Sequence, residues 1–74
     1  MSLSPHQTQL LIAELGFKKK ELEYFEKLLI ESQKILDGIP EPPDTSLAYQ
    51  DMIRRKVTEL KTAIRLHEAM LREV

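Results

Sequence analysis

Seventy-four residues form one domain at most, and a chain this short buries only a modest fraction of its surface. It contains no cysteine, so neither a disulfide nor a thiolate metal site stabilises it. The net charge of −1 argues against general affinity for nucleic acids, and no apolar run approaches the ~20 residues of a membrane span. No signal peptide is visible, so we expect a cytoplasmic protein.

The chain begins with the pattern of a helix start. Ser4 is suited to the N-cap, Pro5 to the first helical position, and Gln7 lies three residues after Ser4, as in a capping box. We therefore expect a helix over 5–36, with residues 1–3 as a leader outside a single domain at 4–74.

Apolar residues in this first segment follow an alternating 4-3 spacing, which predicts a coiled-coil seam. The seam holds Leu11, Leu15, Leu22, Phe25, Leu29 and Leu36, with Lys18 and Ser32 in the two remaining places. A second stripe beside it holds Leu10, Phe17, Tyr24, Leu28 and Ile35.

Gly16 leaves two interpretations of this segment open. Glycine costs roughly 1 kcal/mol inside a helix, and a left-handed Gly16 would end a short first helix and let a second one begin near Lys18. Because the 4-3 spacing continues through Gly16 without a skip, we favour one continuous helix.

The helix is expected to end at Gly38, and residues 37–44 contain three prolines that prevent its continuation. Asp44 is the expected N-cap of a second helix over 45–74, with Thr45 or Ser46 as substitutes. The second helix repeats the 4-3 spacing with Gln50, Ile53, Val57, Leu60, Ile64, His67, Leu71 and Val74. Its neighbouring stripe holds Tyr49, Met52, Ala63, Leu66 and Met70.

The two seams align about the turn into eight layers, in each of which the residue numbers add to 85 or 86. Helices joined by an arbitrary loop would rarely stay in step so long. The layers pair Leu36 with Gln50, Ser32 with Ile53, Leu29 with Val57, Phe25 with Leu60, Leu22 with Ile64, Lys18 with His67, Leu15 with Leu71, and Leu11 with Val74. The predicted fold is all-α, a two-helix antiparallel coiled-coil hairpin with a left-handed crossing.

A hairpin leaves the outer stripe of each helix in water. Such apolar surfaces usually mark interaction sites. We therefore expect dimerisation into a four-helix bundle, or docking onto a partner helix. A monomer in which residues 5–15 fold back as a third helix is the alternative. The expected interaction surface is Phe17, Tyr24, Leu28, Ile35, Met52, Leu66 and Met70.

Signatures of catalysis and of cofactor binding are missing from the sequence. It contains no phosphate-binding glycine loop, nucleophile motif or Glu-x-x-His pair, so we expect no enzyme, cofactor, metal or small-molecule substrate. His6 is interpreted as solvated. His67 is interpreted as part of a polar layer with Lys18, with a pH-sensitive switch opposed by that lysine as the sharper alternative. The basic runs at 18–20 and 54–56 point in several directions on a helix, so nucleic-acid binding is not expected.

The turn carries acids, with Glu41 and Asp44 at its tip. Together with the segment Gly16–Phe25, this hairpin resembles the N-terminal coiled coils of transcript-cleavage (Gre) and DksA-type factors. The resemblance implies an acidic tip inserted into the secondary channel of bacterial RNA polymerase, with the tip role on Asp44 and Glu41. The second globular domain and the zinc-site cysteines of those families are missing here.

Two functions are thus expected from the sequence. The first is a non-catalytic protein–protein interaction or dimerisation module, such as an adaptor, chaperone-like or regulatory subunit, acting through the exposed apolar stripe. The alternative is the acidic-tipped polymerase regulator.

Overall fold

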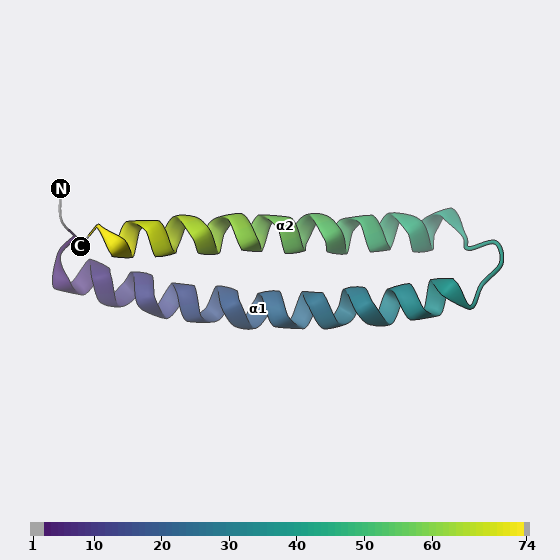
Figure 1. Ribbon diagram of the computed structural model, residues 1–74, viewed down its shortest axis with the longest axis horizontal. Helices are drawn as coiled ribbons and strands as arrows, with labels where there is room; N and C mark the ends of the chain where they lie inside the picture. Colours follow the sequence, from purple (N-terminus) through teal and green to yellow (C-terminus); the bar gives the residue numbers. More distant parts are fainter. Residues whose placement is uncertain (1–2, 74) are drawn as a thin grey trace.

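Two long antiparallel helices make up the fold of the computed structural model, which describes residues 3–73 (Figure 1). Helix α1 spans Pro5–Asp37 and helix α2 spans Asp44–Arg72. The start of α1 and the end of α2 lie side by side at one end of the hairpin, and the turn lies at the other. The molecule measures 54 × 16 × 15 Å, so it is an extended rod. The predicted all-α antiparallel hairpin is confirmed.

The capping box at the start of α1 forms as predicted. The Gln7 backbone N–H donates to the Ser4 hydroxyl oxygen over 3.1 Å, and the Ser4 backbone N–H donates to the Gln7 side-chain oxygen over 3.1 Å. These two bonds satisfy N–H groups that have no partner within the helix. Helix α1 then runs through Gly16 without a break, so the interpretation of one continuous helix is confirmed.

Gly38 ends α1 in an unexpected conformation. Its φ of −85° and ψ of −5° lie in the right-handed region, and its N–H donates to the carbonyl groups of Ile35 and Leu36. The helix therefore ends without the left-handed residue that glycine usually supplies. The prolines that follow are what keep the chain from continuing as helix.

The expected N-cap at Asp44 is wrong by one residue. Pro43 occupies the N-cap with extended φ and ψ of −61° and 149°, and Asp44 is the first residue of α2. Proline fixes its own φ near this value, so it suits the extended cap geometry but offers no side-chain acceptor. The start of α2 consequently has no side-chain cap hydrogen bond. The Asp44 carboxylate still lies in the first turn, where the helix dipole favours negative charge.

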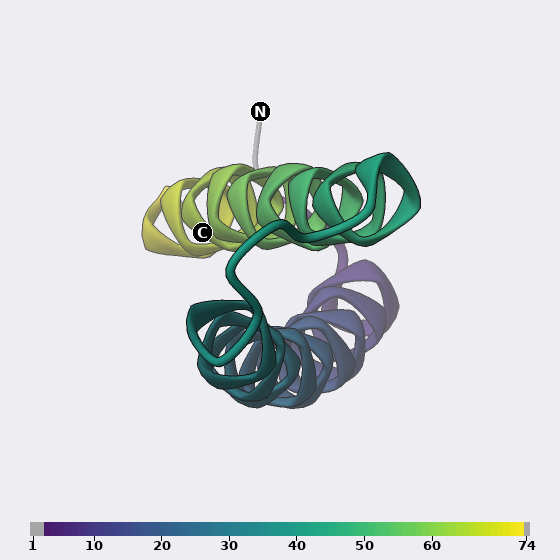
Figure 2. The same cartoon turned by 90° about the vertical axis from the view of Figure 1, so that its right-hand side faces the viewer.

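The predicted seam is the core. Ile53 is completely buried, and the other buried apolar residues among residues 3–73 are Leu11, Val57, Leu60 and Ile64. The remaining predicted seam residues that the structure describes are buried or half-buried. Val74, the expected partner of Leu11, lies outside the described residues. The helices cross obliquely, in the left-handed sense that the 4-3 repeat predicts (Figure 2).

Polar contacts between the helices agree with the predicted register. Those that join α1 to α2 are Gln33 with Gln50, Gln33 with Arg54, Lys19 with Glu68, and Glu14 with His67. The residue numbers in these pairs add to between 81 and 87, scattered about the predicted 85 or 86. Neither helix contains a stretch long and apolar enough to cross a membrane, within the described residues.

Candidate interaction face

The two broad sides of the hairpin differ in chemistry. On one side, polar side chains meet across the helices: the Lys19 ammonium lies 3.8 Å from the Glu68 carboxylate, and Gln33 accepts hydrogen bonds from Gln50 and Arg54. We refer to this side as the polar face. Lys19 and Glu68 are about half exposed, Gln33 is half-buried, and Gln50 is a buried residue of the seam.

The other side carries most of the exposed large apolar residues. Of the twelve such residues in the described chain, eight lie here, and we define them as the apolar face. They are Leu10, Phe17, Tyr24 and Ile35 from α1, with Tyr49, Met52, Leu66 and Met70 from α2. Their exposed fractions run from 47% for Met70 to 68% for Phe17, so the hairpin leaves about half or more of each in water.

The sequence places these residues together through its spacing. On α1, Leu10, Phe17 and Tyr24 are seven residues apart, and on α2 Met52 and Leu66 are fourteen apart, so each series follows one side of its helix. Shallow grooves at both ends of the hairpin are lined by residues of both helices, so the apolar sides of α1 and α2 lie on the same side of the hairpin. One groove near the turn is lined by Ile35 of α1 and Tyr49 of α2, together with Ser32, Leu36, Thr45 and Ser46. The groove near the chain ends is lined by Leu10 of α1 and Met70 of α2, together with Leu3, Gln7, Leu11 and Glu14.

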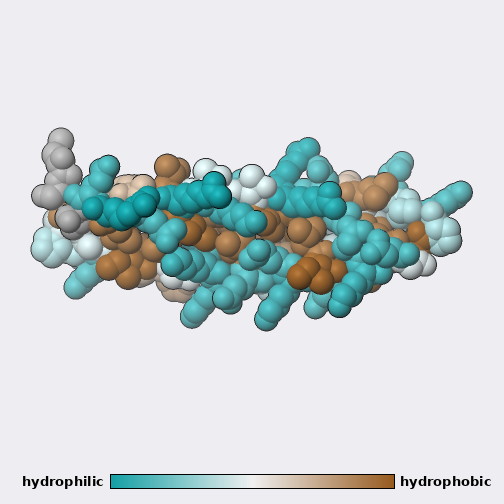
Figure 3. Space-filling view, viewed as in Figure 1, coloured by the Kyte–Doolittle hydropathy of each residue, from teal (hydrophilic) through white to brown (hydrophobic). Residues whose placement is uncertain are grey.

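The apolar face is large for so small a protein. From their exposed fractions, its eight residues together present on the order of 1,000 Å², comparable with the ~800 Å² that each partner buries in a standard interface. Figure 3 shows apolar side chains along the line where the helices meet, and others that stand out from either helix among polar ones. A monomeric protein seldom exposes this much apolar surface on one side without using it.

Charged residues interrupt the apolar face rather than cover it. Glu14, Glu21 and Glu31 of α1 occupy places in the same stripe, as do Lys56 and Glu59 of α2. Both signs of charge are thus present. Neither Glu31 nor Lys56 forms an ion pair with another described residue of its own chain.

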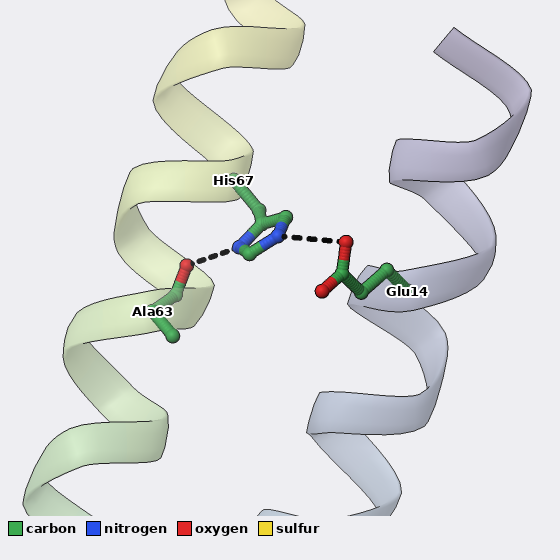
Figure 4. Close-up of polar contacts among 3 residues, drawn as sticks. All are labelled: Glu14, Ala63 and His67. Carbon is green, nitrogen blue, oxygen red and sulfur yellow. Dashed lines mark hydrogen bonds and ion pairs between the residues drawn. The ribbon is translucent and has the colours of Figure 1, made fainter. Parts of the chain in front are cut away.

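His67 meets Glu14 at the edge of this face (Figure 4). Its Nε2 lies 3.4 Å from the Glu14 carboxylate, and its Nδ1 lies 2.6 Å from the Ala63 carbonyl oxygen. The polar contact that His67 makes across the helices is therefore with Glu14, one helical turn before Lys18, its expected layer partner. The side chain of His67 is 16% exposed, which suits a structural residue of the seam.

The residues expected to form the interaction surface are mostly exposed. Phe17, Tyr24, Ile35, Met52, Leu66 and Met70 all belong to the apolar face. Leu28 is half-buried, because it stands close to the seam. Leu10 and Tyr49 belong to the face as well, although the sequence-based surface omits them. The sequence spacing could have identified them, since Leu10 and Tyr49 continue the outer stripes at the two ends of the hairpin.

The expected tip residues, Glu41 and Asp44, are both exposed at the end of the rod opposite the chain ends. Asp37, the nearby acid that closes α1, accepts a hydrogen bond from the Gln33 amide over 2.7 Å. Within residues 3–73, no three histidine or acidic side chains lie close enough together to hold a metal ion. The tip therefore offers exposed charge without an assembled ligand set.

Comparison with known proteins adds no relative: no family model, curated protein or solved structure matches this chain.

Proposed function

We propose that this protein is a non-catalytic interaction module that binds a helical protein partner through the apolar face. The observation that carries this proposal is the gathering of eight exposed large apolar residues on one side of the hairpin. Fully burying an exposed side chain of this size contributes on the order of 1.5–3 kcal/mol, so covering the exposed half of each contributes roughly half of that. A partner that covered the whole face would add as much free energy as the entire stability of a small domain.

The composition of the apolar face supports the same function. Both tyrosines of the chain belong to it, together with one of the two phenylalanines and two of the three methionines. Aromatic residues and methionine are enriched in the buried centres of protein interfaces. Methionine also adapts its shape to a partner surface because its side chain is unbranched and flexible.

A pair of leucines on α2 provides a matched test. Leu66 belongs to the apolar face and is 61% exposed, whereas Leu47 is 46% exposed and lies outside that face. The tagged chain would be used to purify partners from lysate of the source cells, in parallel with Leu66→Glu and Leu47→Glu. We expect both the unaltered chain and Leu47→Glu to retain the bound protein, and Leu66→Glu to lose it.

Circular dichroism of the two variants serves as the folding control. Both substitutions are at exposed helical positions, so both variants should remain helical. Equal loss of the partner in both variants would contradict the apolar face as the binding site. Equal retention would contradict it as well.

The acidic-tipped regulator of bacterial RNA polymerase remains the alternative. Its support is the exposure of Glu41 and Asp44 at the end of a rod 54 Å long. Asp44→Asn would then abolish an effect on transcription while Leu66→Glu left it intact. The apolar face is unused in that function, which is why we prefer the interaction module.

A further inference from the structure

We propose that the partner on the apolar face is a second copy of this chain. Two hairpins stack face to face in a four-helix bundle, with a two-fold axis parallel to the helices and both turns at the same end. This inference rests on the proposed function and names the partner that the face accepts.

The first support is that each helix carries two seams. Besides the core seam, α1 presents residues 10, 14, 17, 21, 24, 28, 31 and 35, and α2 presents 49, 52, 56, 59, 63, 66 and 70. Both series keep the alternating 4-3 spacing, and at ~100° per residue they lie roughly a quarter-turn from the core seam. A helix in a four-helix bundle needs two neighbours at about that angle.

The second support is the extent of the face. A single partner helix lying over the hairpin would contact one row of side chains on each helix and leave outer residues such as Phe17 and Met52 partly in water. A second hairpin supplies two helices and covers both rows. The apolar-face residues of each copy present an area on the order of 1,000 Å², comparable with the area that a stable dimer buries on each side.

Charge complementarity sets the orientation. An axis parallel to the helices keeps every residue at its own level and lays α1 of one copy over α2 of the other. Glu31 and Lys56 occupy nearly the same level, since their numbers add to 87, as do those of the contacting pair Lys19 and Glu68. Glu31 of each copy therefore meets Lys56 of the other, twice in the dimer.

The opposite orientation brings like charges together. With the turns at opposite ends, α1 lies over α1 of the second copy, and matching the two stripes end to end sets Glu31 against Glu14. Like charges that face each other in an interface oppose binding. The arrangement with both turns at one end avoids this contact, and the net charge of −1 adds little repulsion between copies.

Sedimentation equilibrium of the full chain tests the partner. At protein concentrations up to about 100 µM, we expect a mass of twice 8.6 kDa with a micromolar or tighter Kd. Two isoleucines of α1 give a matched comparison: Ile35→Glu on the apolar face should raise Kd by at least about a hundredfold, and Ile30→Glu outside it should leave Kd within about threefold. A monomer, or equal loss in Ile30→Glu, would overturn the inference.

Charge reversal tests the orientation without touching an apolar side chain. Glu31→Lys and Lys56→Glu should each raise Kd by on the order of tenfold, and the double variant should restore it. A tighter dimer in Glu31→Lys would show Glu31 facing another acid and would overturn the arrangement, as would a double variant that fails to recover.

A monomeric chain would overturn the dimer but not the proposed function. The proposed function then stands if Leu66→Glu loses the purified partner and Leu47→Glu keeps it. It fails if the two variants do not differ in this way. A dimer that dissociates only in the apolar-face variants supports both.

Discussion

The side-chain amide of Gln50 on α2 donates a hydrogen bond to the side-chain oxygen of Gln33 on α1, and this bond joins the two helices near the turn. Gln50 is buried, whereas Gln33 is half-buried at the edge of the polar face. The Gln33 amide in turn donates to Asp37 at the end of α1. A buried polar group in an otherwise apolar seam is thereby satisfied, and the satisfied pair favours one register of the hairpin over others.

Removing one partner of this pair should lower the free energy of unfolding more than removing both partners. Gln33→Ala leaves the Gln50 amide buried without its acceptor, so we expect the free energy of unfolding to fall by about 1–3 kcal/mol. Adding Gln50→Leu to that variant should recover most of the loss. Urea denaturation at one fixed protein concentration measures both changes, since the stability of an associating protein depends on its concentration.

The exposed Gln9 of α1 provides the control for that cycle. Gln9→Ala should change the free energy of unfolding by less than about 0.5 kcal/mol. If Gln33→Ala were equally harmless, the bond between the helices would not contribute to the register.

Gly16 is a position where stability can be gained. It lies inside α1, and a Cβ added there would meet no atom within 4 Å. Gly16→Ala should therefore raise the free energy of unfolding by roughly 0.5–1 kcal/mol, because alanine loses less backbone entropy in a helix. For a domain of this size the melting temperature should rise by about 2–8 °C.

Gly38→Ala is the comparison for Gly16. Gly38 lies at the end of α1 with φ of −85°, and its added Cβ would stand 3.5 Å from the Ile35 carbonyl oxygen, an ordinary contact. Alanine fits this conformation, so we expect a smaller change than at Gly16. A loss of stability in Gly16→Ala would mean that the backbone at this position needs glycine.

His67 is a polar residue in the largely apolar seam. Its ring lies between two oxygen acceptors, the Glu14 carboxylate and the Ala63 carbonyl, and only 16% of its side chain is exposed. Glu14 itself is more than half exposed, so its contact with the ring is screened by solvent and adds little. We expect His67→Leu to raise the free energy of unfolding by about 1 kcal/mol in the same urea measurement. Lower stability would instead show that the ring contacts outweigh its burial.

The seam was predictable because one repeat governs both helices. The spacing from Leu11 to Leu36 and from Gln50 to Leu71 determines which residues are buried, and the turn determines how they pair. The continuity of α1 through Gly16 followed from the same repeat. The start of α2 was less predictable, because Asp44 and Pro43 are both suited to a helix start and only the backbone geometry distinguishes them.

The arrangement of the apolar face was predictable only in part. Spacing identifies an outer stripe on each helix, and the expected interaction surface combines residues of both, but spacing alone does not place the two stripes on one side of the hairpin. Their union on one side depends on the handedness of the crossing and on the antiparallel pairing, as the grooves at Ile35 with Tyr49 and at Leu10 with Met70 show. The reach of long side chains was also beyond the repeat, since Glu14 rather than Lys18 contacts His67.

Tyrosine fluorescence offers the most direct measurement of the apolar face. The chain has two tyrosines and no tryptophan, and both Tyr24 and Tyr49 lie on that face, 62% and 48% exposed in the single chain. Acrylamide quenching, followed across a dilution series that spans the dimer Kd, reports how much of the face is covered. We expect the quenching constant to fall by roughly half or more as the dimer forms, because the interface excludes water from both rings. A quenching constant that stays unchanged while the mass doubles would place association elsewhere on the hairpin and contradict the apolar face as its site.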